Sequence, residues 1–377
     1  MNYDELALEL HEKNKGKITT ALRDTHELTK EKLSAYYTPG VAAVSRAIAE
    51  DPAKLPLYTW TNNLVAVISD GSAVLGLGNI GPKGSMPVME GKALLFKHFA
   101  GIDSIPIILD VHTPDTIVET IKAISPSFGA INLEDIAAPQ CFEIEERLKE
   151  ELDIPVFHDD QHGTAVVTLA GLINAMEVVG KKLSDTKIVI IGAGAAGTAI
   201  TKLLHLYAHP QIIAVDSKGI ISTARTDLNE QKKQLLDYVD GSVDGKLEDA
   251  LTGADIFIGV SQPGLLTADL ISSMAEQPVV FALANPTPEI MPDVAKAAGV
   301  AVIATGRSDF PNQVNNAIAF PGIFRGALDN KVTKITDQHK IAAAEAIAGL
   351  IEDPTPDFII PSVFDERLVP AIAEKIR

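Results

Sequence analysis

The sequence has one cysteine, few aromatic residues and a shortage of basic side chains. Among its 377 residues it has one tryptophan, 5% aromatic residues, and 32 lysines and arginines against 50 aspartates and glutamates. The lone Cys141 excludes an intrachain disulfide and a thiolate zinc site, which predicts a protein of the reducing cytoplasm. A net charge of −18 argues against nonspecific binding to nucleic acid or to an anionic membrane, since both would repel the chain.

The chain also lacks long apolar runs. Its first 17 residues are polar and acidic, without the apolar core of a signal peptide, and no uncharged apolar stretch reaches membrane-spanning length. Hydrophobic residues nevertheless make up 46% of the chain, enough to build a core in each of two domains. We therefore expect a globular protein that binds a small molecule, with neither nucleic acid nor membrane as a partner.

Short apolar runs alternate with helical stretches, a pattern typical of parallel sheets with helices on both faces. We predict an α/β protein of two domains: an N-terminal α/β catalytic domain over residues 1–162, and a C-terminal Rossmann-type domain with a doubly wound parallel sheet over 163–377. Helices after residue 338 are expected to pack back on the first domain. The predicted strands cover residues 64–69, 105–109, 129–133, 154–157, 187–191, 212–215, 256–260, 279–284 and 300–304.

Two acidic motifs follow predicted strands. Glu134 and Asp135 come after one strand, and Asp159 and Asp160 come after the next. Because ligands of open α/β sheets bind beyond the carboxyl ends of the strands, we predict that these motifs form one divalent-metal site. Hard oxygen ligands suit Mg²⁺ or Mn²⁺. The alternative is that each pair merely caps the helix that follows it, and two pairs in the same context weaken that alternative.

A glycine-rich turn joins the predicted strand 187–191 to a helix, as a dinucleotide-binding fold requires. Gly192 permits a tight turn, Gly194 lets the backbone approach a pyrophosphate, and Gly197 allows close helix packing. The helix amino terminus adds positive potential. The predicted cofactor contacts at this turn are Gly192, Gly194, Ala195, Ala196 and Gly197.

Asp216 follows the next predicted strand, about twenty residues beyond the glycine turn. An acid at this position accepts hydrogen bonds from the adenosine ribose and repels a 2′-phosphate, which favours NAD. Lys218, Lys232 and Lys233 lie close by in sequence and keep NADP as an alternative.

Three further segments have the look of active-site loops, at residues 36–40, 86–92 and 281–288. Taken in chain order with the acidic motifs and the glycine turn, they resemble the malic enzyme family from near the amino terminus to residue 322. The length resembles the short bacterial type. In this sequence the six motifs read YYTPG, MPVMEGK, NLEDI, HDDQHGTA, GAGAAG and FALANPTP.

The resemblance implies oxidative decarboxylation of L-malate to pyruvate and CO₂, with reduction of NAD(P). Lys92 matches the family's base for the C2 hydroxyl, a role that needs a neutral amine, and a nearby cation would lower its pKa. Tyr37 matches the acid that protonates C3 of enolpyruvate. The residues alone also allow purely structural interpretations. Lys92 could be a solvated lysine at the start of a helix over 93–99, and Tyr37 could be a packing residue at a turn.

The same resemblance assigns the metal ligands to Glu134, Asp135 and Asp160, with the cation acting as a Lewis acid. Asp159 is expected either to link the metal to Lys92 or to cap a helix. His158 and His162 flank the carboxylates, and we interpret them as hydrogen-bonding scaffold, since hard-metal sites seldom use imidazole.

Neutral amides are expected to bind the substrate carboxylates. Asn285, Asn315 and Asn316 match the family's substrate-binding positions, with Asn285 also near the cofactor, although asparagines often serve only to fix turns. Val260 and Ser261, after the strand 256–260, are expected to contact the nicotinamide half of the cofactor.

One departure from the family concerns substrate charge. Ser72 and Ala73 stand where larger members resembling animal enzymes carry an acid and an arginine. Lys92, Arg307 or a residue of a partner subunit are candidates to neutralise the second malate carboxylate. The resemblance implies a homodimer or a higher homo-oligomer, in which Tyr37 could serve the neighbouring site.

Three other functions compete with malic enzyme activity. A metal-dependent oxaloacetate decarboxylase on the same scaffold would skip hydride transfer, and the intact glycine turn with Asp216 argues against it. A malolactic reaction is disfavoured because the malolactic members of the family are longer. A non-catalytic metabolite sensor would have no need to keep the base, the acid and three metal ligands together.

Overall fold

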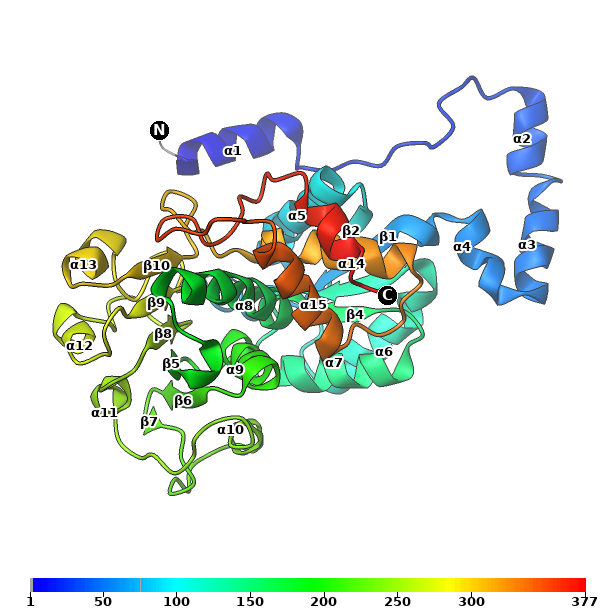
Figure 1. Cartoon of the computed structure of the whole chain (residues 1–377). Coiled ribbons are helices and arrows are strands. Elements are labelled where there is room, and N and C mark those ends of the chain that lie inside the picture. The colour runs from blue at the N-terminus through cyan, green and yellow to red at the C-terminus, as the bar shows by residue number, and fades with distance from the viewer. Residues whose placement is uncertain (1–2, 75) are drawn as a thin grey trace.

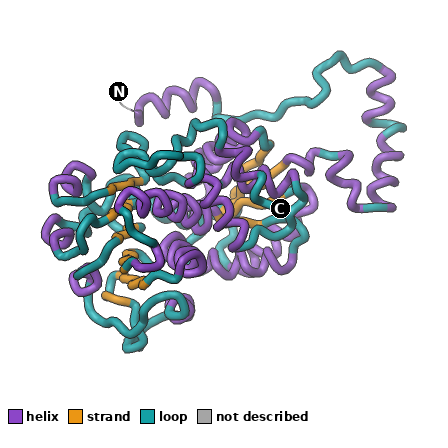
Figure 2. Tube along the Cα trace, in the orientation of Figure 1, coloured by secondary structure: helices purple, strands orange, loops and turns teal. Residues whose placement is uncertain are grey.

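The computed structural model describes residues 3–74 and 76–377, and it contains two parallel sheets surrounded by helices (Figures 1 and 2). The first sheet has four strands in the order β2-β1-β3-β4, all parallel. Because β3 and β4 are neighbours, the residues that follow them meet at one edge. The strands are β1 (Leu64–Ser69), β2 (Asp103–Ile108), β3 (Ala130–Leu133) and β4 (Val156–His158).

The second sheet has six strands in the order β10-β9-β8-β5-β6-β7, and its last strand is antiparallel. Strands β8, β9 and β10 are buried along their length, which explains their continuous apolar sequences. This is the Rossmann-type sheet that the sequence predicts. The strands are β5 (Lys187–Ile191), β6 (Gln211–Asp216), β7 (Gly219–Ile220), β8 (Ile256–Gly259), β9 (Val279–Ala282) and β10 (Val302–Thr305).

The helices are distributed over both halves of the chain. In the N-terminal half they are α1 (Tyr3–Asn14), α2 (Lys30–Tyr36), α3 (Val41–Glu50), α4 (Leu55–Tyr58), α5 (Gly81–Ala100), α6 (Pro114–Ile124), α7 (Gln140–Glu151) and α8 (Asp159–Val179). In the C-terminal half they are α9 (Ala195–Ala208), α10 (Glu230–Leu235), α11 (Leu247–Leu251), α12 (Ala268–Ser272), α13 (Pro292–Ala297), α14 (Phe320–Asp329), α15 (Asp337–Ala348) and α16 (Leu368–Ala373). Single 3₁₀ turns are η1 (Pro52–Lys54), η2 (Trp60–Asn63), η3 (Ser125–Ser127), η4 (Leu183–Asp185) and η5 (Asn316–Ile318).

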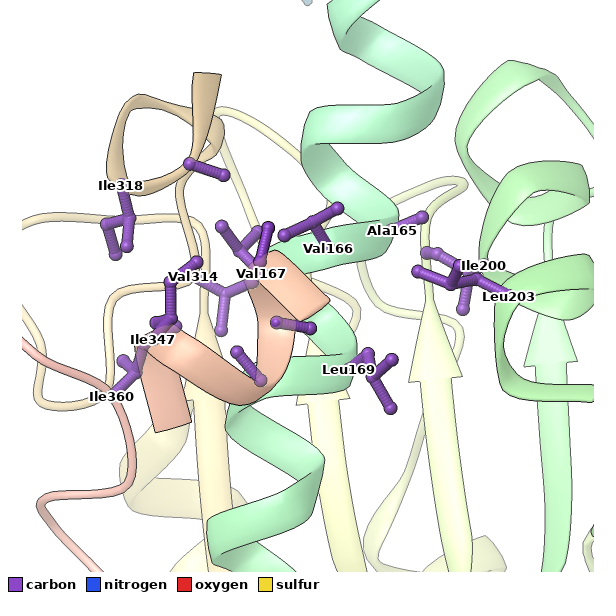
Figure 3. Packing of buried hydrophobic residues seen from close by; sticks show 14 of the residues in the cluster. Ala165, Val166, Val167, Leu169, Ile200, Leu203, Val314, Ile318, Ile347 and Ile360 are labelled. Atoms are coloured by element: carbon purple, nitrogen blue, oxygen red, sulfur yellow. The ribbon is translucent and has the colours of Figure 1, made fainter. Parts of the chain in front are cut away.

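Helix α8 connects the two sheets. It begins directly after β4 and packs against α9 and α15, and Figure 3 shows Val166, Val167 and Leu169 within this shared core. Within the part of the chain described here, it is the one helix long and apolar enough to cross a membrane. With 72% of its apolar window buried inside the protein, it is a core helix.

The C-terminal tail packs against the N-terminal half as well as its own. Helix α16 lies on α14, and α14 contacts α5. The Phe364 ring meets that of Phe99 on α5 edge to face, with 6.0 Å between centroids. These contacts join the last forty residues to the helix that carries Lys92.

Two boundaries differ from the sequence prediction. Residues 86–92 were expected to form a loop, yet they lie inside α5. The helix continues through Pro87 and its internal glycines because contacts from outside it, such as Lys17 Nζ donating to the Pro87 carbonyl, support it. Helix α8 starts at Asp159, four residues earlier than the predicted 163, so Asp159 and Asp160 occupy its first turn.

The N-terminal segment contacts α5 and β2 through residues between α1 and α2, such as Lys17 and Arg23. Helices α1, α2 and α3 contain no buried residue, and Figure 1 shows α2 and α3 away from both sheets. Exposed apolar side chains on this segment and just beyond it include Leu22, Leu28, Leu33, Tyr36, Tyr37, Val44, Leu57 and Trp60.

Candidate active site

The carboxyl edges of the two sheets face a common cavity of about 380 Å³. Residues of both acidic motifs, the glycine turn, the loops after β8 and β9, and the amide segment line it. Residues predicted separately from distant parts of the sequence therefore meet in one place. Those lining the cavity are Asp135, Asp160, Ala195, Ala196, Val260, Ser261, Asn285, Asn315 and Asn316, together with Ala73, Ile136, Ala138, Thr164, Leu283, Ala284 and Val314.

Three carboxylates converge at this cavity. Each of Glu134, Asp135 and Asp160 offers an oxygen, and these oxygens lie within 4.8 Å of one another. Together with Asp159 they concentrate negative charge that the Lys92 ammonium offsets only in part. The all-oxygen donor set and the excess negative charge fit a hard divalent cation such as Mg²⁺ or Mn²⁺.

A left-handed residue shapes this carboxylate group. Asp135 has a φ of 54°, and its N–H donates to Asp160 Oδ2 at 2.7 Å, joining the two acidic motifs. Its carbonyl accepts from the Ala73 N–H at 3.0 Å, and Ser72 Oγ accepts from the Ala137 N–H at 2.9 Å. The loop that carries Ser72 and Ala73 therefore supports the turn of the first acidic motif.

Lys92 is buried beneath the carboxylates, with 7% of its side chain exposed, which excludes a solvated lysine. Its Nζ lies 2.8 Å from Glu134 Oε1 and 2.5 Å from Asp159 Oδ2, and 4.2 Å from the centre of the Phe320 ring. Burial disfavours its charged form, but the charges of Asp159 and Glu134 outweigh burial and hold the Lys92 pKa above its ordinary value.

In an ordinary ion pair the cation lowers the pKa of its carboxylate partner, whereas the pKa values of the carboxylates around Lys92 are raised. Burial raises the pKa of Asp159 and of Asp160 to about 6, although the Lys92 charge opposes this. Burial also raises the pKa of Glu134. Such shifts occur where like charges are held together out of water, as in sites built to bind a cation.

Behind the acidic motif, Glu145 on α7 anchors the start of α8. It accepts the His158 N–H at 3.0 Å and the His162 Nε2 at 2.8 Å, and Lys149 lies 2.6 Å away. Burial lowers the pKa of His162 to about 3, so its ring is neutral and acts as scaffold, as predicted. The buried ring of His158 has no hydrogen-bond partner among the described residues, so the scaffold interpretation does not extend to that ring.

The glycine turn has the predicted close contacts. Gly192 has a φ of 109°, and a Cβ at Gly197 would overlap the Gly192 carbonyl oxygen. Gly194 has open space around its missing Cβ. The turn therefore leaves room for a pyrophosphate at the amino terminus of α9.

Asp216 is paired with basic side chains, one of them the Lys232 that its sequence neighbourhood suggested. Its carboxylate lies 2.8 Å from Arg225 Nη1 and 2.6 Å from Lys232 Nζ, and it accepts the Lys218 N–H at 2.8 Å. Burial opposes ionisation, but the bonds from Arg225 and Lys232 outweigh it and lower the Asp216 pKa to about 2. Arg225 was missed because nothing in its local sequence indicates the pairing.

The amides at the cavity serve the backbone as well. Asn315 Oδ1 accepts the Ala317 N–H at 2.9 Å, so this side chain fixes a turn while lining the cavity. The side chain of Asn285 fits against Gly306, where a Cβ would lie 2.7 Å from its Nδ2. Asn315 thus fixes a turn and also lines the cavity. Asn285 lines the cavity and packs against Gly306.

Lys92, Glu134 and Asp159 lie behind the cavity wall, and Gly192, Gly194, Gly197 and Asp216 also do not line it, but two further candidates are placed away from the site. Tyr37 directly follows α2 and is 68% exposed, within the segment that stands away from the sheets. Arg307 is paired with Asp309, at 2.6 Å, and does not line the cavity, so it is a poor candidate for neutralising substrate. Sequence reasoning also missed the fully buried Glu289, which joins two cavity loops.

A Rossmann-type sheet with its glycine turn, facing a carboxylate cluster and a buried lysine across one cavity, defines a dinucleotide-dependent oxidoreductase. Residues 11–149 match the family described as malic enzyme, N-terminal domain, and residues 161–376 match malic enzyme, NAD binding domain. The chain belongs to the malic enzyme family.

Relatives that match over most of this chain agree with this membership. The chain is 53% identical over 380 residues to a bifunctional malic/malolactic enzyme of Bacillus subtilis, covering 100% of this chain and 92% of that protein. It is 54% identical to an NAD-dependent malic enzyme of Geobacillus stearothermophilus, covering 92% and 73%. An NADP-dependent malic enzyme of Halomonas elongata is 48% identical, with 99% and 92% covered.

Solved structures show the same fold. The crystal structure of an NAD-dependent malic enzyme from Thermotoga maritima superposes with a TM-score of 0.95 at 51% identity, covering 98% of both chains. A malic enzyme from Pyrococcus horikoshii gives a TM-score of 0.95 at 47% identity, covering 99% of this chain and 89% of that one. Nothing in these comparisons supports the decarboxylase alternative.

Proposed function

We propose that this protein is a malic enzyme that converts L-malate to pyruvate and CO₂ while reducing NAD(P). The observation that carries the proposal is the position of Lys92. Its amine is buried against Glu134 and Asp159, beside a cavity that Asp135, Asp160 and the glycine turn share. A base, a carboxylate cluster and a dinucleotide turn thus surround one small volume.

Lys92 is the proposed base that receives the proton of the C2 hydroxyl at Nζ. Asp159, 2.5 Å away, fixes the amine and stabilises the ammonium that forms. A divalent cation held by Glu134, Asp135 and Asp160 would supply Lewis-acid polarisation and offset the carboxylate charge that raises the Lys92 pKa. The dinucleotide would supply the hydride acceptor.

Asn285, Asn315 and Asn316 are proposed to orient the substrate by donating from neutral amides. Apolar side chains beside them, including Ile136 and Val314, line the same cavity and limit water around the reacting carbons. With Lys92 assigned as the base and Arg307 paired with Asp309, a residue of a partner subunit remains the candidate for neutralising the second substrate carboxylate.

Tyr37 is proposed to act in the neighbouring site of a homodimer. It is 68% exposed and stands on a segment without buried residues, so it needs a second chain to reach a buried position. Mixing inactive Lys92→Ala and Tyr37→Phe subunits should then restore about a quarter of wild-type activity, because half of the random dimers contain one complete site. A Tyr37 that acts in its own chain gives no restoration.

The cofactor is proposed to be NAD, with NADP as the alternative. Asp216 favours NAD, whereas Arg225 and Lys232, which contact its carboxylate, reduce its repulsion of a 2′-phosphate. Relatives of both cofactor types match the chain. The cytoplasmic location expected from the single cysteine stays a prediction.

The decisive experiment follows reduced-nicotinamide absorbance with L-malate and Mn²⁺, adding NAD or NADP in parallel, and assays pyruvate and lactate at the end. A parallel sample contains oxaloacetate and Mn²⁺ in place of malate. Reduction coupled to pyruvate supports the proposal and identifies the cofactor, and Lys92→Ala should abolish it. Oxaloacetate consumption without any reduction would instead indicate the decarboxylase. Lactate would indicate malolactic activity, which length does not exclude, since the similarly long Bacillus subtilis relative is named for both reactions.

A further inference from the structure

Glu289 is a buried carboxylate at the carboxyl edge of the second sheet. It has 0% exposure, and its two oxygens accept from different loops. Oε1 accepts the Ser261 N–H at 3.0 Å, and Oε2 accepts the Ala284 N–H at 3.1 Å. One side chain therefore joins the segment after β8 to the segment after β9.

Both joined segments belong to the cavity wall. Ser261 lines the cavity after β8, and Ala284 lines it immediately before Asn285. The Glu289 backbone adds a third connection, because its carbonyl accepts the Leu266 N–H at 3.1 Å. The nicotinamide side and the substrate-amide side of the cavity thus depend on the same residue.

The surroundings of Glu289 are built to admit a carboxylate. A Cβ at Gly259, the last residue of β8, would overlap the Glu289 carboxyl group, so only glycine leaves it room. Burial raises the Glu289 pKa, and the backbone N–H groups of Ser261 and Ala284 oppose this shift. A buried carboxylate costs folding free energy, so an apolar residue would serve better if the position only filled space.

We propose that Glu289 is a positioning residue that holds the Ser261 loop and the Asn285 loop in one arrangement, so that nicotinamide and the substrate carboxylate are presented together. The identity of these ligands rests on the proposed function. Glu289 touches neither ligand itself and acts through the two N–H groups.

Glu289→Gln is the sharpest test, because an amide offers a single acceptor oxygen and leaves one of the two N–H groups facing an NH₂ group. Gly259→Ala should have the same effect from the opposite side, by displacing the carboxylate. Asp255→Asn is the matched control. Asp255 lies just before β8, at the other end of the strand, and likewise accepts a backbone N–H, from Lys187 at 2.9 Å, and a lysine, Lys181, at 2.7 Å.

The readouts are kcat and KM for malate, melting temperature, and dissociation constants for NADH and for ADP, which probes only the adenosine half of the site. In Glu289→Gln we expect kcat/KM to fall at least about tenfold and NADH to bind more weakly, with ADP affinity within about twofold of wild type. Asp255→Asn should lower the melting temperature comparably and leave these kinetic and binding values unchanged.

The proposal is overturned if Glu289→Gln only lowers the melting temperature, or if NADH and ADP weaken in parallel. The ratio of NADH to ADP affinity does not require turnover. It therefore tests Glu289 even if the wild-type protein proves inactive toward malate, which would count against the proposed function alone.

Discussion

Lys92 illustrates how a residue's role depends on its neighbours. Its family motif predicts a base, whereas its local sequence on its own favours a solvated lysine. Only the folded chain shows the amine buried against Glu134 and Asp159. The residue types of the site could be read from the sequence, whereas the pairing of Asp216 with Arg225 and the connection made by Glu289 arise from loops whose geometry the sequence does not specify.

Without the positive charge of Lys92, the carboxylates around it should repel one another and destabilise the protein. We expect Lys92→Met to abolish turnover and to destabilise the metal-free protein by about 3 kcal/mol, because buried carboxylates lose their cation. Mn²⁺ should raise the melting temperature of the variant more than that of wild type, since the cation replaces the missing positive charge.

Thermal melts of both proteins with and without Mn²⁺ make the comparison, and a chelator removes the metal again. An equal Mn²⁺ effect in the two proteins would contradict a cation site at these carboxylates. Arg325→Met, which removes a cation paired with Asp329 at 2.6 Å outside the cavity, serves as control.

Asp216 gives a pH prediction with a defined sign. Its folded pKa of about 2 lies below the ordinary value of 3.8, so its ion pairs stabilise the protein above that value and this contribution is lost as pH falls toward 2. Arg225 and Lys232 are 12% and 26% exposed, and with solvent screening we expect about 1 kcal/mol.

Asp216→Asn should therefore be less stable than wild type at pH 6, and the difference should shrink toward pH 2.5. Denaturant unfolding at both pH values measures it. A difference that is the same at both values would show that the Asp216 charge does not contribute.

At the scale of elements, the strands were the most predictable part and helix starts the least. Apolar runs such as β1 and β5 coincide with the predicted ranges because both faces are buried. Helix α5 was missed over its first half because Gly84, Pro87 and Gly91 resemble a loop. Contacts from outside the helix, such as Lys17 Nζ donating to the Pro87 carbonyl, are invisible in the local sequence.

Two glycines at the turn into α9 are expected to have different roles: Gly197 allows close helix packing, and Gly194 allows the cofactor to approach the backbone. Gly197→Ala should destabilise the protein by about 2 kcal/mol or more, because the new methyl group meets the Gly192 carbonyl. Gly194→Ala has open space and a φ of −89°, so the fold should tolerate it, while NADH affinity drops as the methyl group occupies the pyrophosphate position.

Melting temperature and NADH titration distinguish the two variants. Equal melting temperatures with equal NADH affinities would refute this division of roles within one turn.

At the scale of the whole molecule, α1, α2 and α3 contain no buried residue among those described, although Lys17 and Arg23, between α1 and α2, contact the rest of the chain. The exposed apolar side chains of this N-terminal segment fit a second copy of the protein better than water. Sequence motifs predicted both sheets and their shared cavity, but the position of Tyr37 outside that cavity depends on the path of this segment, which carries no strong local signal.

Leu33→Asp on α2 should weaken self-association, because it places a charge on this apolar surface. Leu33 is 48% exposed, so the isolated chain should remain folded. Light scattering coupled to size exclusion measures the mass, with Lys30→Glu on the same helix as control. Unchanged mass and turnover in Leu33→Asp would place the subunit contact elsewhere.

Helix α8 carries Asp160 at its first turn and packs against α9 and α15 of the C-terminal half. A gene split after β4 would therefore leave Glu134 and Asp135 on one polypeptide and Asp160 on the other. Neither fragment alone would contain the complete carboxylate set. We therefore expect cation binding only when the two fragments are co-expressed and reassemble. The complete carboxylate set proposed to bind the cation therefore requires both halves of the chain.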